Sequence, residues 1–180
     1  MYNQIIEFLF RASCSIQRRV SELNTKNIRL IEVPMTLSGK DLINKTHDLP
    51  KGYKLRKFTD SDILKFHKLM FRSKMGYCSL HYWKNFILPG GFFIVEHVKS
   101  KKVVGALFAA KDPVSLDEDT GTMGFLATDP KHRGKKIASV LAFQTASRLL
   151  NEGFGRNVIY PYEHKQEVIG MYLRHGWKKE

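Results

Sequence analysis

The chain has 180 residues, of which 43% are hydrophobic and 26% charged, and its 30 Lys and Arg against 17 Asp and Glu give a formal net charge of +13. This length fits one domain with a short extension, and the hydrophobic and aromatic content argues against wholesale disorder. No run of about 18 apolar residues occurs, so we expect no membrane span. The two cysteines, Cys14 and Cys78, are too few for a disulfide framework and indicate a reducing compartment, so we expect a cytoplasmic protein. The charge predicts an anionic partner, which could be a nucleic acid, a membrane surface or a phosphate-rich small molecule.

The first 50 residues differ in character from the rest. Residues 1–23 place apolar side chains on one helical stripe, with arginines mostly off it. This pattern predicts either a mitochondrial import segment or an amphipathic helix packed on a domain or partner. Residues 33–52 are rich in Pro, Gly, Ser, Asp and Asn and predict an irregular connector, so we place a domain boundary near Pro50. The net charge lies after that boundary, because residues 51–180 carry 23 Lys and Arg against 12 Asp and Glu.

After the boundary, strand and helix patterns alternate. Thr59, Asp60, Ser61 and Asp62 offer N-cap chemistry for a helix that follows the first strand. A short helix over 80–88 is expected to end at Pro89-Gly90-Gly91. The predicted strands cover 53–58, 92–98, 103–110, 122–128 and 158–160, with another beginning at Trp177. The predicted order, a hairpin followed by strand–helix–strand–helix, indicates an α/β or α+β fold with one mixed sheet.

The densest basic run is Lys131-His132-Arg133-Gly134-Lys135-Lys136. It follows the predicted strand 122–128 and precedes an amphipathic helix that begins at Ala138. A helix N-terminus presents unpaired backbone N–H groups and a partial positive charge, which favour anions. The run therefore predicts a phosphate or pyrophosphate site at residues 133–138, beside which His132 is expected to be solvated. The spacing fits neither a Walker loop nor a dinucleotide fingerprint.

These residues resemble a known family. Residues 126–138, Leu-Ala-Thr-Asp-Pro-Lys-His-Arg-Gly-Lys-Lys-Ile-Ala, resemble motif A of the GNAT N-acetyltransferase superfamily, commonly Gln/Arg-x-x-Gly-x-Gly/Ala. Residues 168–177, Val-Ile-Gly-Met-Tyr-Leu-Arg-His-Gly-Trp, resemble its motif B, commonly Ala-x-x-Leu-Tyr-x-x-x-Gly-Phe. The resemblance covers residues 50–180, and residues 51–180 are therefore expected to form a GNAT domain preceded by an N-terminal helix and connector at 1–50.

The resemblance implies acetyl-CoA as acyl donor and a primary amine as acceptor, which attacks the thioester directly. The site residues that it implies are Leu126, Ala127 and Thr128 along the pantetheine arm, Arg133, Gly134, Lys135, Lys136, Ile137 and Ala138 at the pyrophosphate, and Tyr172 as general acid. Glu96 is a candidate general base, as are Asp117, Glu118 and Asp119. The histidines show no ligand spacing, so no metal is expected.

The chain departs from the family pattern at three places. Lys136 replaces the central glycine of motif A. If residue 136 is helical, this replacement costs little conformational free energy. If the backbone must instead approach the cofactor closely, the replacement weakens cofactor binding. Lys165 aligns with a frequent asparagine and could instead reach a phosphate. Only four residues follow Gly176, so the closing strands of the fold are expected to be largely missing. A foreshortened sheet edge would favour pairing with a second chain, which makes a homodimer an expectation.

Two other functions stay open at this stage. One is a catalytically silent remnant that binds acyl-CoA, which the three departures suggest. The other is a basic nucleic-acid-associated domain that uses residues 131–136. The second is disfavoured, because the basic run has neither interleaved aromatic residues nor a recognition helix.

Overall fold

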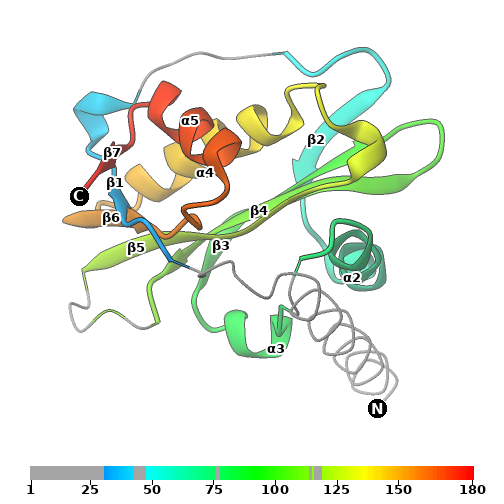
Figure 1. Cartoon of the computed structure of the whole chain (residues 1–180). Coiled ribbons are helices and arrows are strands. Elements are labelled where there is room, and N and C mark those ends of the chain that lie inside the picture. Colours follow the sequence, from blue (N-terminus) through cyan, green and yellow to red (C-terminus); the bar gives the residue numbers. More distant parts are fainter. Residues whose placement is uncertain (1–30, 43–47, 76–77, 114, 116–118) are drawn as a thin grey trace.

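A computed structural model of the chain describes residues 31–42, 48–75, 78–113, 115 and 119–180. Within these residues one seven-stranded sheet has helices on both faces (Figure 1). The strands are β1 (Met35–Thr36), β2 (Tyr53–Lys57), β3 (Ile87–His97), β4 (Lys102–Lys111), β5 (Thr120–Thr128), β6 (Arg156–Ile159) and β7 (Lys178–Lys179). The α-helices are α2 (Ile63–Arg72), α3 (Leu80–Trp83), α4 (Ile137–Leu150) and α5 (Gln166–Arg174), and the 3-10 helices are η1 (Gly39–Asp41), η2 (Asp60–Asp62) and η3 (Pro130–His132).

The sheet is mixed, as the sequence predicts. Its strand order is β2-β3-β4-β5-β6-β1-β7. Neighbouring strands are antiparallel except β5 and β6, which are parallel and joined by α4. A parallel pair needs such a crossover connection, because its second strand must return to the starting edge of the sheet. The predicted mixed α/β fold is confirmed.

Two hydrophobic clusters lie on opposite faces of this sheet. The larger one packs α4 and α5 on β3, β4 and β5, and it contains Leu141, Leu149 and Tyr172. The smaller one packs α2 on the other face around Phe66 and Phe108. The helix α4 approaches the sheet closely at Gly105, where an added Cβ would lie 2.5 Å from Cγ2 of Ile137. The position of α4 therefore depends on a strand residue without a side chain.

The N-cap chemistry predicted at residues 59–62 is present. Thr59 and Asp62 form a capping box at η2, directly before α2. Arg56 donates to both carboxylate oxygens of Asp62, at 2.6 and 2.8 Å. These hydrogen bonds lower the pKa of the buried Asp62 carboxyl to about 2. The start of α2 is thus fixed by a charged contact with β2.

The helix predicted over 80–88 is wrong in its length. It forms only four residues, Leu80–Trp83, and β3 begins at Ile87, before the Pro89-Gly90-Gly91 segment that was expected to end a helix. The pairing of β3 with β4 is irregular between Ile87 and Phe92, so the three residues pass through a break in the ladder. Pro and Gly are tolerated in a strand at such a break, because a regular ladder hydrogen bond is not required there.

The strand β1 lies in the segment that the sequence predicts to be an irregular connector. Met35 is antiparallel to Ile159 of β6 and to Lys179 of β7, so β1 lies between these two strands. The Met35 side chain is fully buried in the same cluster as Trp177. The sheet therefore includes residues that precede the boundary predicted near Pro50. The helix predicted over 1–23 lies outside the described residues.

Candidate functional site

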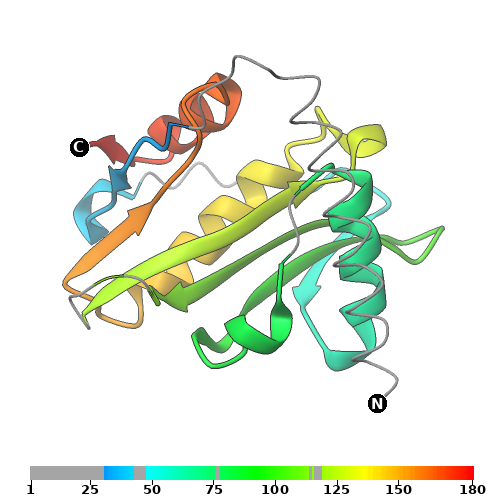
Figure 2. The same cartoon turned by 60° about the horizontal axis from the view of Figure 1, so that its bottom comes forward.

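The strands β5 and β6 run side by side only at their beginnings. Thr120, Gly121 and Thr122 pair with residues 156–158, whereas β5 continues to Thr128. Along residues 123–128, the side of β5 that faces away from β4 has no partner strand within the described chain (Figure 2). Leu126, Ala127 and Thr128, which the resemblance assigns to the pantetheine arm, lie on this open edge. Its backbone groups are available to an extended ligand, which can bind a free strand edge through main-chain hydrogen bonds.

A β-bulge interrupts β5 on the same open stretch. Gly124 is opposite Phe108 and Ala127 is opposite Ala106, so two residues of β5 face a single residue of β4. One of these two, Phe125, has a φ of 60°, which non-glycine residues rarely adopt. Bulges turn the backbone locally and are frequent beside active sites. This bulge could not be predicted from the sequence, since nothing in its residue types demands a positive φ at Phe125.

The turn between β5 and α4 contains the residues of the predicted anion site. We call residues 130–136 the phosphate loop. Gly134 has a φ of 74° and Lys136, which directly precedes α4, has a φ of 60°. Arg133, Lys135 and Lys136 are exposed, and the backbone of the loop leads into the first N–H groups of α4, at Ile137 and Ala138. The predicted pyrophosphate residues 133–138 are thus brought together at a helix N-terminus.

The conformation of Lys136 decides between two alternatives left open above. The alternative in which residue 136 is helical is wrong, because its φ and ψ of 60° and 9° lie in the left-handed region. Lys136 therefore takes the backbone conformation that suits the glycine of motif A, at a cost of about 1–2 kcal/mol for a residue with a Cβ. Relative to the glycine of motif A, Lys136 adds a cation at this turn.

A partly buried ion pair holds the beginning of the phosphate loop against α2. Arg72 donates Nε to Oδ2 of Asp129 at 2.5 Å and Nη2 to the carbonyl of Val103 at 2.9 Å. The other carboxylate oxygen of Asp129 accepts from the amide of Lys131 at 3.1 Å. Burial raises the pKa of Asp129, but the hydrogen bonds from Arg72 and Lys131 outweigh it, and the pKa lies below its ordinary value.

Three rings hold the other side of the phosphate loop against the sheet. The hydroxyl of Tyr53 lies 2.8 Å from Nδ1 of His132. The ring of His97 lies 5.2 Å from each of the rings of Tyr53 and His132. Burial lowers the pKa of His132, which is half-buried and not simply solvated as expected. The loop is therefore fixed by side chains of β2, β3 and α2, contacts that sequence reasoning missed because they join distant segments.

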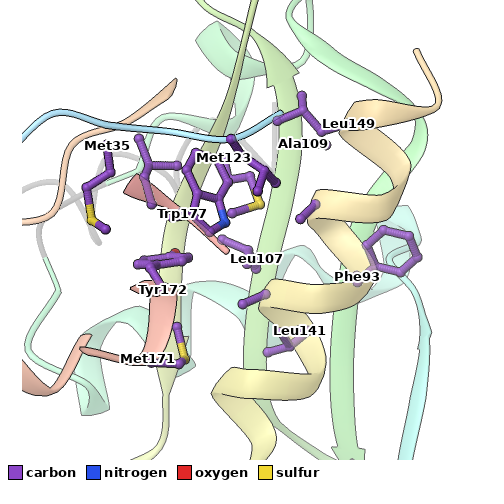
Figure 3. Close-up of a cluster of buried hydrophobic side chains, with 14 of the residues drawn as sticks. Met35, Phe93, Leu107, Ala109, Met123, Leu141, Leu149, Met171, Tyr172 and Trp177 are labelled. Atoms are coloured by element: carbon purple, nitrogen blue, oxygen red, sulfur yellow. The ribbon is translucent and has the colours of Figure 1, made fainter. Parts of the chain in front are cut away.

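The Tyr172 side chain lies in the larger hydrophobic cluster, on the face of the sheet that carries α4 (Figure 3). Tyr172 is 5% exposed, and its ring lies 5.8 Å from that of Trp177. Burial raises the pKa of its hydroxyl above the ordinary value. Tyr172 is therefore protonated at neutral pH, as a proton donor must be.

The structure does not bring Glu96 together with Tyr172. Glu96 contacts Arg56 at 2.8 Å, beside Asp62 at the start of α2, which covers the opposite face of the sheet. The hydrogen bond from Arg56 lowers the pKa of Glu96, which makes it a weaker base. The assignment of Glu96 as general base stays a prediction.

The other predicted site residues are Lys165 and the acidic residues 117–119. Lys165 is an exposed residue directly before α5, and its backbone amide donates to the carbonyl of Tyr162 at 2.9 Å. Asp119 accepts a hydrogen bond from the amide of Gly155, whereas Asp117 and Glu118 lie outside the described residues. In the part of the chain that the structure covers, no cluster of three or more His, Cys, Asp or Glu could hold a metal ion. No helix in that part is long and apolar enough to cross a bilayer.

Comparison with known proteins agrees with this fold. The family model described as "Acetyltransferase (GNAT) family" matches residues 59–177. Because the match covers most of the chain, including the phosphate loop and α5, the chain belongs to the GNAT acetyltransferase family. No curated protein matches the chain.

Several solved structures have the same fold as this chain. A GNAT-family acetyltransferase of Novosphingobium aromaticivorans is similar with a TM-score of 0.63 and 15% identity over 85% of this chain and 62% of that one. A GCN5-related N-acetyltransferase of Sphaerobacter thermophilus has a TM-score of 0.62 and 13% identity, covering 90% of this chain and 53% of that one. A Drosophila protein has a TM-score of 0.65 and 18% identity, covering 91% and 54%. The chain thus spans between half and two thirds of the length of these three proteins.

Proposed function

We propose that the protein transfers an acetyl group from acetyl-CoA to a primary amine of a small molecule or peptide. One observation carries the proposal: the open edge of β5 leads directly to a cationic helix N-terminus. An extended chain with a pyrophosphate at one end, which is the shape of the pantetheine arm and diphosphate of CoA, fits this combination. The two features are adjacent in sequence, because Thr128 ends the strand and Pro130 begins the phosphate loop.

The residues of the site fit this donor. An added Cβ at Gly134 would meet no atom within 4 Å, so the loop backbone lies open to a ligand. Oγ1 of Thr128 is buried and has no hydrogen-bond partner within the described chain. In the proposal, the amides of residues 133–138 bind the pyrophosphate, the side chains of Arg133, Lys135 and Lys136 add charge, and residues 126–128 bind the arm. Lys165 would reach a phosphate from the start of α5.

The chemistry needs a polarised acyl carbonyl and a route for two protons. Acetyl-CoA supplies an activated acyl group as a thioester. A backbone amide at the bulge of β5 would donate to the developing oxyanion, and Tyr172 would give its proton to the departing sulfur. The attacking amine must lose a proton to a base. Glu96 remains the candidate for that step, although its contact with Arg56 disfavours it.

Calorimetric titration with acetyl-CoA tests donor binding. We expect binding at sub-millimolar concentration, and a marked loss of affinity when Arg133 and Lys135 are both replaced by Ala. The matched control is Lys40→Ala with Lys84→Ala, which removes the same charge far from the phosphate loop. If the unchanged chain does not bind at sub-millimolar acetyl-CoA, the proposal is wrong.

Turnover is tested separately, by release of free thiol with a panel of polyamines, amino acids and peptides. Tyr172→Phe should lower turnover by about a hundredfold or more while leaving acetyl-CoA affinity nearly unchanged. Binding without turnover for any amine would favour the second candidate function, a catalytically silent protein that binds acyl-CoA. The observation that favours this candidate is the paired, weakly basic state of Glu96. A homodimer and a cytoplasmic location stay predictions.

A further inference from the structure

The positive charge of the chain is concentrated in four short segments. Residues 51–54, 68–74, 99–102 and 131–136 contain 12 of the 30 Lys and Arg and none of the 17 Asp and Glu. All other residues together carry 18 Lys and Arg against 17 Asp and Glu, so they are close to neutral. All ten lysines of the four segments and Arg133 are exposed. Because the four segments carry 12 positive charges and no negative one, nearly the whole net charge of +13 is located in them.

The fold brings the four segments to one end of the sheet, which we call the basic end. Tyr53 contacts both His97, at the start of the β3–β4 turn, and His132 in the phosphate loop. The amide of Val98 in that turn donates to the carbonyl of Gly52 at 2.9 Å. The contact between Arg72 and Asp129 brings the C-terminal end of α2 to the same end of the sheet. Figures 1 and 2 both show the β3–β4 turn, η3 and the start of β2 at the same end of the molecule.

The size of the basic end exceeds what the proposed donor requires. One CoA molecule contacts a few cations of the phosphate loop, whereas eight of the twelve cations lie in the three other segments. The lysines of the β3–β4 turn belong to neither the loop nor the open edge of β5. A cationic surface of this extent attracts a polyanion.

Two apolar side chains interrupt this charged surface. Val98, in the β3–β4 turn beside Lys99, is 43% exposed, and Phe71, between Lys68 and Arg72, is 40% exposed. Exposed apolar side chains among lysines suit an interface where the charges meet anionic headgroups and the apolar groups enter the boundary layer. A nucleic acid would instead use aromatic rings with a free face, but the rings of Tyr53, His97 and His132 pack on one another.

We propose that the basic end binds the surface of an anionic phospholipid bilayer. The lysines of residues 51–54, 68–74 and 99–102 contact the headgroups, and Val98 and Phe71 enter the interface. The chain binds on the bilayer without crossing it. This role is independent of acetyl-CoA and goes beyond the proposed transferase reaction.

Vesicle co-sedimentation tests the proposal with the unchanged chain and two triple variants. One variant, called the turn variant, carries Lys99→Glu and Lys101→Glu in the β3–β4 turn and Lys102→Glu at the first residue of β4. The matched control carries Lys40→Glu, Lys84→Glu and Lys179→Glu, which change the net charge equally at exposed sites outside the basic end. The vesicles contain phosphatidylcholine alone or with phosphatidylglycerol, and thermal unfolding verifies that each variant is folded. Val98→Asp provides a fourth protein, in which one apolar side chain is replaced by an anionic one.

We expect the unchanged chain to sediment with the phosphatidylglycerol vesicles only, and less so as salt is raised. The turn variant should bind roughly a hundredfold more weakly and the control should stay within a few fold. Val98→Asp should weaken binding as well. Equal losses in the turn variant and the control would overturn the proposal, because net charge alone would then explain binding. Failure to bind anionic vesicles at low salt would also overturn it, and so would binding of single-stranded RNA under conditions where vesicles are not bound.

Discussion

We expect Lys136→Gly to give a more stable protein than Lys136→Ala, and we expect the opposite order at the neighbouring Lys135. Lys136 has a φ of 60°, whereas Lys135 is not among the residues with positive φ. All four substitutions remove one exposed cation from the phosphate loop. The comparison between Gly and Ala at each position therefore isolates the backbone conformation from the charge.

The expected difference follows from two opposing terms. A residue with a Cβ pays about 1–2 kcal/mol in the left-handed conformation. Gly pays about 0.5–1 kcal/mol relative to Ala, because it loses more conformational freedom on folding. At residue 136 the first term is larger, so Gly should be favoured by roughly 0.5–1 kcal/mol, or about 1–4 °C in Tm for a chain of this size. At residue 135 only the second term acts, so Ala should be favoured by a similar amount.

Urea unfolding and thermal unfolding of the four variants measure both differences. Acetyl-CoA titration adds a second readout, because a loop that already holds the required conformation should bind the donor more tightly in Lys136→Gly than in Lys136→Ala. The reasoning is refuted if Ala is the more stable choice at both positions. In that case residue 136 does not take the glycine-like conformation in solution.

Three further predictions concern residues that support the site. The pKa of Asp62 is about 2 in the folded chain against an ordinary 3.8, so its ion pair stabilises the fold above about pH 4 and this stabilisation is lost as pH falls toward 2. Arg56→Met should therefore move acid unfolding, followed by circular dichroism, to higher pH; an unchanged midpoint would contradict the role of the pair. Arg72→Met leaves the buried carboxylate of Asp129 without its main partner and should weaken acetyl-CoA binding about tenfold in calorimetry, whereas unaltered affinity would show that the phosphate loop does not depend on this contact. Gly105→Ala should destabilise the chain by about 1–3 kcal/mol in urea unfolding, because α4 must move away from β4; a loss below the error of the measurement would speak against the close packing at Ile137.

The sequence predicted the parts of the fold whose signals are local. The capping residues 59–62, the periodic apolar residues of α4 and the β-rich apolar runs of the β3–β4 hairpin each lie within one short window, and all three elements are present. The strand β1 was missed because two residues are too few to show an alternating pattern, and its pairing partners lie more than a hundred positions away. The extent of β3 was misjudged because Pro89 and the two glycines were expected to end a helix and to precede the strand, yet here a break in the ladder accommodates them within β3.

Some parts of the candidate site could likewise be predicted from the sequence, and others could not. The cations and the glycine of the phosphate loop are visible in the sequence, since their types and spacing carry the anion-binding chemistry. The positive φ of Lys136 and Phe125 has no counterpart in residue type, because the surrounding structure imposes it. The contacts of Arg72 and Tyr53 with the loop depend on how the sheet and α2 meet, and this is decided by tertiary packing.

The position of β1 between β6 and β7 has a consequence for synthesis of the chain. During translation, Met35 leaves the ribosome long before either of its partner strands has been made. Its side chain, which is fully buried in the finished fold, cannot reach its final contacts until residues 159 and 179 are available. Pairing between such distant segments is slow, because the entropy of closing a long loop is lost before any contact compensates for it. The side of the sheet that carries α5 should consequently form last and limit the rate at which the whole domain becomes native.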